Sequence, residues 1–265
     1  MLHLSLGIDI YIGVITFILG ACVGSFLNCM AWRIIEGESI LKGRSHCDVC
    51  GHVLSFGDLI PIVSFLVHHG KCRYCGAKLS AGHVFAELSA GLTFVLLLFQ
   101  YDISFQTLEC MLFACILLGA AFADLKGYII PDRFIVAGIV LRIPFFFLLS
   151  DLKGQLVSAV LGGFVVGGGL LLIVLFYEKV RKIEAMGGGD LKLLFVTGLY
   201  LGFAKNVLCL LFACVIGIVF ALITAKAREN QENAKIFPWG PSISAAAILT
   251  MLIGNEIIGA YLSLF

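Results

Sequence analysis

Two aspartates stand out in a very apolar chain, because each lies at the end of a segment apolar enough to cross a bilayer. Asp124 closes one such segment, and Asp190 follows three consecutive glycines at the start of another. A carboxylate near the hydrocarbon core is energetically costly, so its presence there indicates a functional site. Two carboxylates at the same depth can share one proton and activate water for peptide-bond hydrolysis. We therefore predict that Asp124 and Asp190 are catalytic.

The tripeptide Asp-Leu-Lys occurs three times and provides an internal comparison, since it begins at Asp124, Asp151 and Asp190. Asp151 lies in a predicted short turn at the opposite membrane face, which excludes it from the pair. The alternative for a single aspartate is an interfacial helix cap, a role that suits Asp190 at a predicted helix start. Finding both aspartates beside Gly and Pro favours the catalytic interpretation.

The residues that flank the pair have physical uses of their own. Gly187 and Gly189 allow backbone conformations closed to other residues and let an extended substrate approach closely. Pro131 breaks the helix after Asp124 and can open a cavity for water, and Asp132 follows it directly. Lys192 is a candidate to tune the carboxylates, although an interfacial lysine more often snorkels toward water. We assign these residues a supporting role.

Four cysteines form a second constellation, in the two motifs Cys47-x-x-Cys50 and Cys72-x-x-Cys75, each followed by glycine. Two such motifs about twenty residues apart are typical of a tetrahedral zinc site. A reducing compartment argues against two disulfides. Because four thiolates fill the coordination shell, we predict one structural Zn²⁺ that folds a loop too small for its own core. A pair of redox-sensitive thiols is the alternative.

Composition indicates an integral membrane protein. Of 265 residues, 60% are hydrophobic and 13% charged, whereas soluble domains are about half apolar and about a quarter charged. The net charge of +1 gives no basis for nucleic-acid binding. Because a span needs roughly 20 apolar residues, we predict an all-α polytopic membrane protein with about eight transmembrane helices. The predicted spans are residues 10–31, 83–100, 107–124, 132–150, 155–177, 189–203, 206–225 and 241–263.

Basic residues predict the orientation in the bilayer. They are concentrated in the loop between the first two predicted spans and in the loops after the third, fifth and seventh spans. Cytoplasmic loops carry the excess of Lys and Arg, so we place the first loop in the cytoplasm and both termini outside. The predicted organisation is a first transmembrane segment over residues 1–31, a cytoplasmic zinc-binding loop over 32–82 and a membrane-embedded peptidase domain over 83–265.

An ordered set of motifs resembles the bacterial type IV prepilin peptidases, a family of bifunctional leader peptidases and N-methyltransferases with a Gly-x-Gly-Asp motif. The set covers nearly the whole chain. It departs from the family at Asp48, where Pro is usual, and at His83-Val84, where Tyr-Pro is common. The motifs are Gly24-Ser25-Phe26-Leu27-Asn28 with Arg33 beyond it, the double Cys-x-x-Cys loop, Glu87, Asp124 before Ile130-Pro131-Asp132, Gly187 to Asp190, and Phe237 to Pro241.

The resemblance implies an intramembrane aspartic endopeptidase that cleaves the basic leader from type IV prepilins or pseudopilins at the cytoplasmic face of the bacterial inner membrane. It also implies methylation of the new N-terminal residue with S-adenosylmethionine as co-substrate, in type IV pilus or type II secretion systems. Gly24, Asn28, Arg33 and Glu87 are the candidates for methyl transfer, with packing and loop closure as the alternative.

Other classes of protein share parts of this pattern. A preflagellin-type peptidase without methyltransferase activity shares the aspartates, but the long zinc loop and the Gly-Ser-Phe-Leu-Asn block argue against it. A presenilin-like protease has a Tyr-Asp context that is absent at Asp124. A proton-coupled transporter would use the aspartates as a relay and would need a structural repeat, which the sequence lacks beyond the Asp-Leu-Lys triplets.

Overall fold

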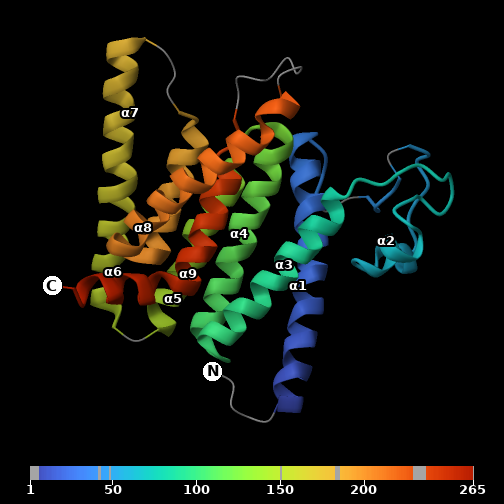
Figure 1. Ribbon diagram of the computed structural model, residues 1–265, viewed down its shortest axis with the longest axis horizontal. Coiled ribbons are helices and arrows are strands. Elements are labelled where there is room, and N and C mark those ends of the chain that lie inside the picture. Colours follow the sequence, from blue (N-terminus) through green and yellow to red (C-terminus); the bar gives the residue numbers. More distant parts are fainter. Residues whose placement is uncertain are drawn as a thin grey trace. The chain divides into compact units, whose positions relative to one another are not determined.

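The computed structural model of the chain describes residues 6–40, 43–47, 49–149, 151–182, 186–228 and 237–264 (Figure 1). The departure at Asp48 lies outside these residues. The chain forms two compact units, Met1–Ile103 and Ser104–Phe265. The boundary between the units falls after residue 103, whereas the start of the peptidase domain was predicted from the sequence at residue 83. The assignment of the peptidase activity to residues 83–265 stays a prediction.

Unit 1 is built on a pair of long helices, α1 (Leu6–Ile35) and α3 (Gly82–Tyr101). Small residues let the two backbones approach closely. A Cβ atom on Gly20 would lie 2.8 Å from the carbonyl oxygen of Ala90, and one on Gly24 would collide with the carbonyl oxygen of Ala86. The glycines of α1 are therefore part of the helix contact.

The loop between α1 and α3 contains a short 3₁₀ helix, η1 (Phe56–Leu59), and one turn of helix, α2 (Val63–Val67). Within the described residues no β-strand forms, and the loop has only two isolated antiparallel bridges, His46 to Val53 and Lys71 to Lys78. Each bridge closes one of the two Cys-x-x-Cys turns, so the cysteines lie at the tips of two small hairpin-like loops.

All regular secondary structure in the described residues of unit 2 is helical (Figure 1). Its elements are α4 (Phe105–Gly127), α5 (Asp132–Leu148), α6 (Leu152–Val160), a π-helical turn η2 (Leu161–Gly167), α7 (Gly168–Arg181), α8 (Gly188–Arg228) and α9 (Gly240–Leu262). The segments α6, η2 and α7 follow one another without a break, and the fifth predicted span, 155–177, lies within them.

Helix α8 is interrupted at Gly202, whose backbone angles (φ 74°, ψ −178°) are open to glycine almost alone. Asn206 nevertheless donates a hydrogen bond to the carbonyl oxygen of Leu194 at 3.2 Å. Twelve residues of straight helix would separate these positions by about 18 Å. The chain therefore turns back at Gly202, between the two segments predicted as the sixth and seventh spans.

Six of the described helices are long and apolar enough to cross a membrane: Gly7–Ile35, Gly82–Tyr101, Phe105–Gly127, Leu152–Arg181, Gly188–Thr224 and Gly240–Leu262. The all-α membrane fold is thus confirmed, whereas the predicted number of eight spans is not. The difference has two causes. Helix α5 has 17 residues, which is at the lower limit for a span, and the two helices that meet at the turn at Gly202 are counted together as Gly188–Thr224.

A buried ion pair holds one end of unit 2 together. Arg142 of α5 pairs with Glu109 of α4, and both side chains are less than a tenth exposed. The Nε atom of Arg142 also donates to the carbonyl oxygen of Leu199 at 3.1 Å, and its guanidinium lies over the ring of Phe146. Buried charges are tolerated when they are paired and hydrogen-bonded in this way, so the contact links α4, α5 and α8.

Candidate active site and metal centre

Asp124 lies in the last turn of α4 and is only 4% exposed. The helix ends because Tyr128 adopts a left-handed conformation and its N–H returns to the carbonyl oxygen of Asp124 at 2.9 Å. Pro131 then caps α5 in an extended conformation, which is compatible with the helix break predicted at this position. The carboxylate of Asp124 is thereby held at the junction between two helices.

The N-terminus of α9 provides the hydrogen-bond donor for this carboxylate. The backbone N–H of Gly240 donates to Oδ2 of Asp124 at 2.9 Å, as suits a helix N-terminus, where N–H groups lack partners inside the helix. A Cβ atom on Gly240 would lie 2.8 Å from the same oxygen. The Pro-Trp-Gly-Pro turn at residues 238–241 was noted from the sequence but was assigned no role at the site. This turn is the sequence feature that could have identified Gly240 as a partner of Asp124.

Asp190 lies in the first turn of α8 and is half-buried. Its N–H donates to the carbonyl oxygen of Gly187 at 3.1 Å, and a Cβ atom on Gly189 would lie 3.0 Å from Cβ of Ile130. Ile130 also lies against Gly240, where an added Cβ atom would be 3.1 Å from its Cδ1 atom and 2.8 Å from Oδ2 of Asp124. The structure therefore brings the two predicted aspartates together at one end of unit 2. Gly189 and Gly240 lie at the close contacts around them.

Lys192 and Asp132, both predicted to support the pair, bond to each other. The Nζ atom of Lys192 lies 2.7 Å from Oδ1 of Asp132, and the two side chains are 53% and 70% exposed. Exposed pairs of this kind contribute about 0–1 kcal/mol. Their contact links the start of α5 to the start of α8 beside the aspartates.

The third Asp-Leu-Lys copy lies far from this end. Asp151 is the N-cap of α6, and its Oδ1 accepts a hydrogen bond from the N–H of Gly154 at 3.1 Å. Helix α5 starts at Asp132, and its 17 residues place Asp151 about 25 Å along the helix axis from that start. Asp151 is a helix cap, and it offers an internal control for the aspartate pair.

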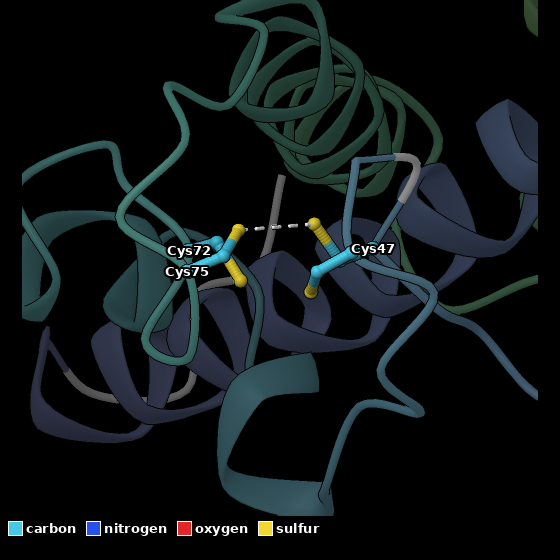
Figure 2. A group of neighbouring side chains, drawn as sticks. Cys47, Cys72 and Cys75 are labelled. Atoms are coloured by element: carbon cyan, nitrogen blue, oxygen red, sulfur yellow. Dashed lines mark hydrogen bonds between the residues drawn. The ribbon is translucent and has the colours of Figure 1, made fainter.

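The four predicted metal ligands form a tight cluster in unit 1, and Figure 2 labels three of them, Cys47, Cys72 and Cys75. The sulfur atoms of Cys47, Cys50, Cys72 and Cys75 all lie within 4.8 Å of one another, and those of Cys47 and Cys75 are 3.9 Å apart. Sulfur atoms around a tetrahedral Zn²⁺ at about 2.3 Å are about 3.8 Å apart. The donor set and its spacing therefore fit a metal ion.

The two halves of the cluster have the same local structure. The N–H of Gly51 donates to the carbonyl oxygen of Cys47, as that of Gly76 does to Cys72, and both glycines have φ near +70°. Hydrogen bonds from the backbone of Cys50 and then of Val49 lower the pKa of the Cys47 thiol to about 7. A thiol that ionises near neutral pH is suited to metal binding, because the thiolate is the ligand.

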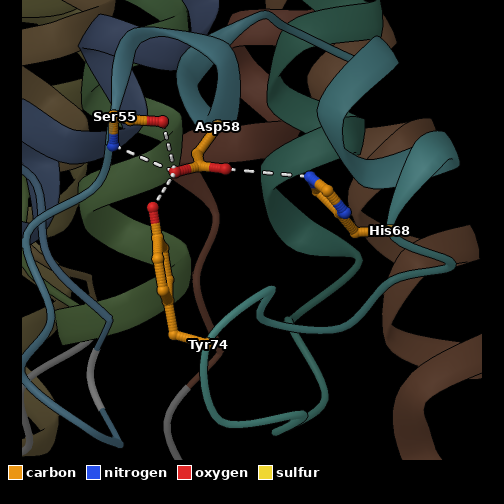
Figure 3. Close-up of polar contacts among 4 residues, drawn as sticks. All are labelled: Ser55, Asp58, His68 and Tyr74. Atoms are coloured by element: carbon orange, nitrogen blue, oxygen red, sulfur yellow. Dashed lines mark hydrogen bonds and ion pairs between the residues drawn. The ribbon is translucent and has the colours of Figure 1, made fainter.

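A carboxylate connects the second cysteine turn to the segment that follows the first turn (Figure 3). Oδ2 of Asp58 accepts hydrogen bonds from the hydroxyl of Ser55 at 2.7 Å and from the hydroxyl of Tyr74 at 3.1 Å, and its other oxygen lies 3.7 Å from Nε2 of His68. The hydrogen bonds from Ser55 hold the pKa of Asp58 below its usual range. Sequence reasoning missed this residue, since nothing in the pattern distinguishes it from other loop carboxylates.

The four residues predicted for methyl transfer all lie in unit 1. Gly24 packs against α3, and Asn28 bonds to Nδ1 of His83 at 2.9 Å. Glu87 accepts hydrogen bonds from the hydroxyl of Ser25 at 2.8 Å and from the N–H of Ile62 at 2.7 Å. Gly24, Asn28 and Glu87 thus lie along the contact between α1 and α3.

Arg33 has different partners. Its guanidinium donates to the carbonyl oxygens of Ile40 at 3.2 Å and Gly43 at 3.4 Å. It therefore closes the chain that follows α1 rather than bonding across the helix pair.

Comparison with known proteins gives a consistent family. Residues 18–101 match the Bacterial Peptidase A24 N-terminal domain, and residues 111–222 match the Type IV leader peptidase family. No solved structure matches the chain.

Three relatives carry the name prepilin leader peptidase/N-methyltransferase. The protein from Myxococcus xanthus (strain DK1622) is 34% identical over 86% of this chain and 68% of its own length. That from Bacillus subtilis (strain 168) is 31% identical over 94% and 98%, and that from Aeromonas salmonicida (strain A449) is 28% identical over 99% and 98%. With the paired aspartates and the four-cysteine loop, these matches show that the chain belongs to the type IV leader peptidase family.

Proposed function

We propose that this chain is a prepilin leader peptidase that removes the basic leader from type IV prepilins or pseudopilins at the cytoplasmic face of the membrane. The names of its relatives support the substrate class. The observation that carries the proposal is the arrangement of Asp124 and Asp190 at one end of unit 2, with the N–H of Gly240 bound to Asp124. The match of residues 18–101 to the bacterial N-terminal domain favours this function over a preflagellin-type peptidase.

The chemistry follows from the two carboxylates. Two neighbouring carboxylates cannot both ionise cheaply, so the pair shares one proton. The ionised member takes a proton from water as the water oxygen attacks the scissile carbonyl, and the protonated member donates its proton to the carbonyl oxygen. Gly240 occupies Oδ2 of Asp124, which leaves Oδ1 for the shared proton or the water. Titration would belong to the pair and not to either residue.

The second activity in the proposal is methylation of the new N-terminal residue with S-adenosylmethionine. The relatives' names support it, and we assign it to unit 1, with Gly24, Asn28, Arg33 and Glu87 as the residues concerned. Because Glu87 and Asn28 already bond to other parts of unit 1, we propose that they act by positioning the loop. S-adenosylmethionine supplies the methyl group.

We propose that Cys47, Cys50, Cys72 and Cys75 hold one structural Zn²⁺. Four thiolates complete a tetrahedral shell and leave no position for a substrate. The ion would link two turns that are separated by about twenty residues of chain and that also meet through the rings of His52 and Tyr74, whose centroids are 3.6 Å apart. Binding energy at such a site is folding energy, so the metal would stabilise the loop.

The proposed location is the bacterial inner membrane, with the cysteine loop in the cytoplasm and both termini outside. The six apolar helices support a membrane location, and the excess of basic residues in the first loop supports the orientation. Reporter fusions at residue 153 and at the C-terminus should report the outer face, whereas a tag inserted after Gly37, outside the cysteine turns, should be accessible only from the cytoplasm. The reverse pattern would refute the proposed orientation.

Replacement of the aspartates tests the proposed catalysis. Asp124→Asn and Asp190→Asn should each abolish leader removal from a purified prepilin, because neither variant can form the shared-proton pair. Asp151→Asn is the matched control, since it changes the same tripeptide about 25 Å away, and it should cleave at the wild-type rate. Mass measurement of the product follows the reaction. Efficient cleavage by either of the first two variants, inserted at normal levels, would refute the mechanism.

A further inference from the structure

The loop of unit 1 has an apolar surface that its own unit leaves exposed. In α2, Val63, Leu66 and Val67 share one face because residues three and four apart are neighbours on a helix. Phe65 turns inward instead, where its ring lies over Gly70. The exposed side chains of this surface are between 42% and 89% accessible: Phe56, Leu59, Ile60, Val63, Leu66 and Val67. We call them the apolar loop surface.

The contacts of Glu87 show how deep this surface lies relative to the helices of unit 1. Glu87 is five residues from the start of α3, about 7 Å along its axis. It binds the backbone N–H of Ile62 and the hydroxyl of Ser25. Ser25 is itself ten residues, about 15 Å, before the end of α1. The loop thus folds back along the two helices instead of remaining beyond their ends.

Helix α3 provides the scale for the bilayer. Its 20 residues span about 30 Å, which equals the thickness of the hydrocarbon core. A backbone contact about 7 Å inside its first residue therefore lies at the depth of segments that bury an apolar face about 5–10 Å into the headgroup and acyl boundary. The apolar loop surface is continuous with this contact, since Ile60 and Val63 flank Ile62.

Four successive or neighbouring backbone N–H groups here have partners within unit 1, which lowers the cost of contact with lipid. The N–H groups of Val63, Ser64 and Leu66 each donate to a carbonyl oxygen within the segment, at 2.6–3.1 Å. That of Ile62 donates to Glu87. Ile62 has φ 64° and ψ −50°, the rare and strained form of γ-turn, so its position is determined by these surrounding bonds.

The distribution of charge suits the same environment. Asp58 is the only charged residue between residues 53 and 67, and its side chain, 6% exposed, turns inward to Ser55 and Tyr74. The exposed basic residues Lys71 and Arg73 follow the apolar segment in the chain. An apolar face beside basic side chains is typical of segments that lie in the membrane interface.

We propose that the apolar loop surface inserts into the lipid bilayer next to α1 and α3, so that the four-cysteine loop is anchored to the membrane at a third point besides its two covalent ends. The partner is the bilayer itself, at the boundary between headgroups and acyl chains. The anchor fixes the height and orientation of the cysteine loop at the membrane. This inference rests on the contacts of unit 1 and does not depend on the proposed catalysis.

Fluorescence quenching in reconstituted full-length protein tests the anchor. A fluorescent residue, dansylalanine, replaces Leu66, which is 64% exposed, by suppression of a stop codon. The matched control replaces Val49, which is 72% exposed but lies in the first cysteine turn. Lipids that carry a nitroxide near the top of the acyl chain should quench the probe at 66 several-fold more than the probe at 49. Aqueous iodide should show the opposite order. Val63 is the second probe site if the protein labelled at 66 does not accumulate.

The other outcomes would overturn the proposal. If iodide quenches both probes and the nitroxide lipids quench neither, the apolar loop surface faces water. If the probe at residue 66 is shielded from both quenchers, another protein segment covers the surface. Zinc content and leader cleavage, measured on the same samples, show that the labelled proteins are folded.

Discussion

Replacement of Gly240 by alanine tests whether the position of the Asp124 carboxylate matters for cleavage, because it moves the carboxylate without removing it. In Gly240→Ala both aspartates remain, but the added Cβ would lie 2.8 Å from Oδ2 of Asp124 and 3.1 Å from Cδ1 of Ile130. Asp124 is a short, buried side chain, so it has little freedom to withdraw. It must move by several tenths of an ångström, which weakens the hydrogen bond from the N–H of the same residue.

The expected loss can be worked out from that hydrogen bond. A hydrogen bond to a charged group contributes about 1.5–3 kcal/mol. If the displaced carboxylate loses it in the transition state, kcat/KM for leader cleavage should fall about 10- to 150-fold. The fall should be smaller than in Asp124→Asn, because the displaced carboxylate can still take a proton from water.

Gly259→Ala is the matched control for this experiment. Gly259 lies in the same helix, and a Cβ atom there would meet nothing within 4 Å. The assay is the initial rate of cleavage of a purified prepilin in detergent at several substrate concentrations. Gly259→Ala should cleave at the wild-type rate. If Gly240→Ala is also within twofold of the wild type, the N–H of Gly240 does not position the catalytic carboxylate.

Two further predictions concern unit 1. Purified protein should contain about one zinc per chain. Cys72→Ser should lose the zinc together with most of the methylation activity, whereas Cys214→Ser, which removes a thiol outside the cluster, should keep both. A wild-type protein without zinc would refute the metal site. Glu87→Ala removes both carboxylate oxygens and leaves the N–H of Ile62 without its acceptor, so it should cost about 1–3 kcal/mol, and methylation should fall more than cleavage. Exposed Glu36→Ala is its control, and equal methylation by the two variants would exclude a role for Glu87.

Much of the membrane fold was accessible from the sequence because long apolar segments have few alternatives in a bilayer. The predicted span 107–124 lies within α4, and the gap left between residues 203 and 206 lies next to the turn at Gly202. The count of spans was less accessible. Hydropathy cannot show that α5 is only 17 residues long or how the two parts of α8 are joined.

The sequence predicted those site residues whose type and spacing are compatible with few kinds of chemistry. Four cysteines in two short motifs specify a metal site locally, so the tight cluster was expected. The partner of Asp124 could not be predicted in the same way, because Gly240 is 116 residues away in the chain and a backbone N–H has no side-chain signature. Glu109 and Arg142 did give a signal, as charged residues inside predicted spans, and only packing shows that they neutralise each other.

The bond from Gly240 also has a consequence for biosynthesis. Helix α9 follows all the other described helices in the chain, so the ribosome completes α4 and α8 first. Until α9 enters the membrane, Asp124 lacks its backbone donor although both aspartates are already in place. Under the proposed function, a nascent or truncated chain without α9 should therefore cleave leaders more slowly, and the protease reaches its full activity only when synthesis has passed residue 240.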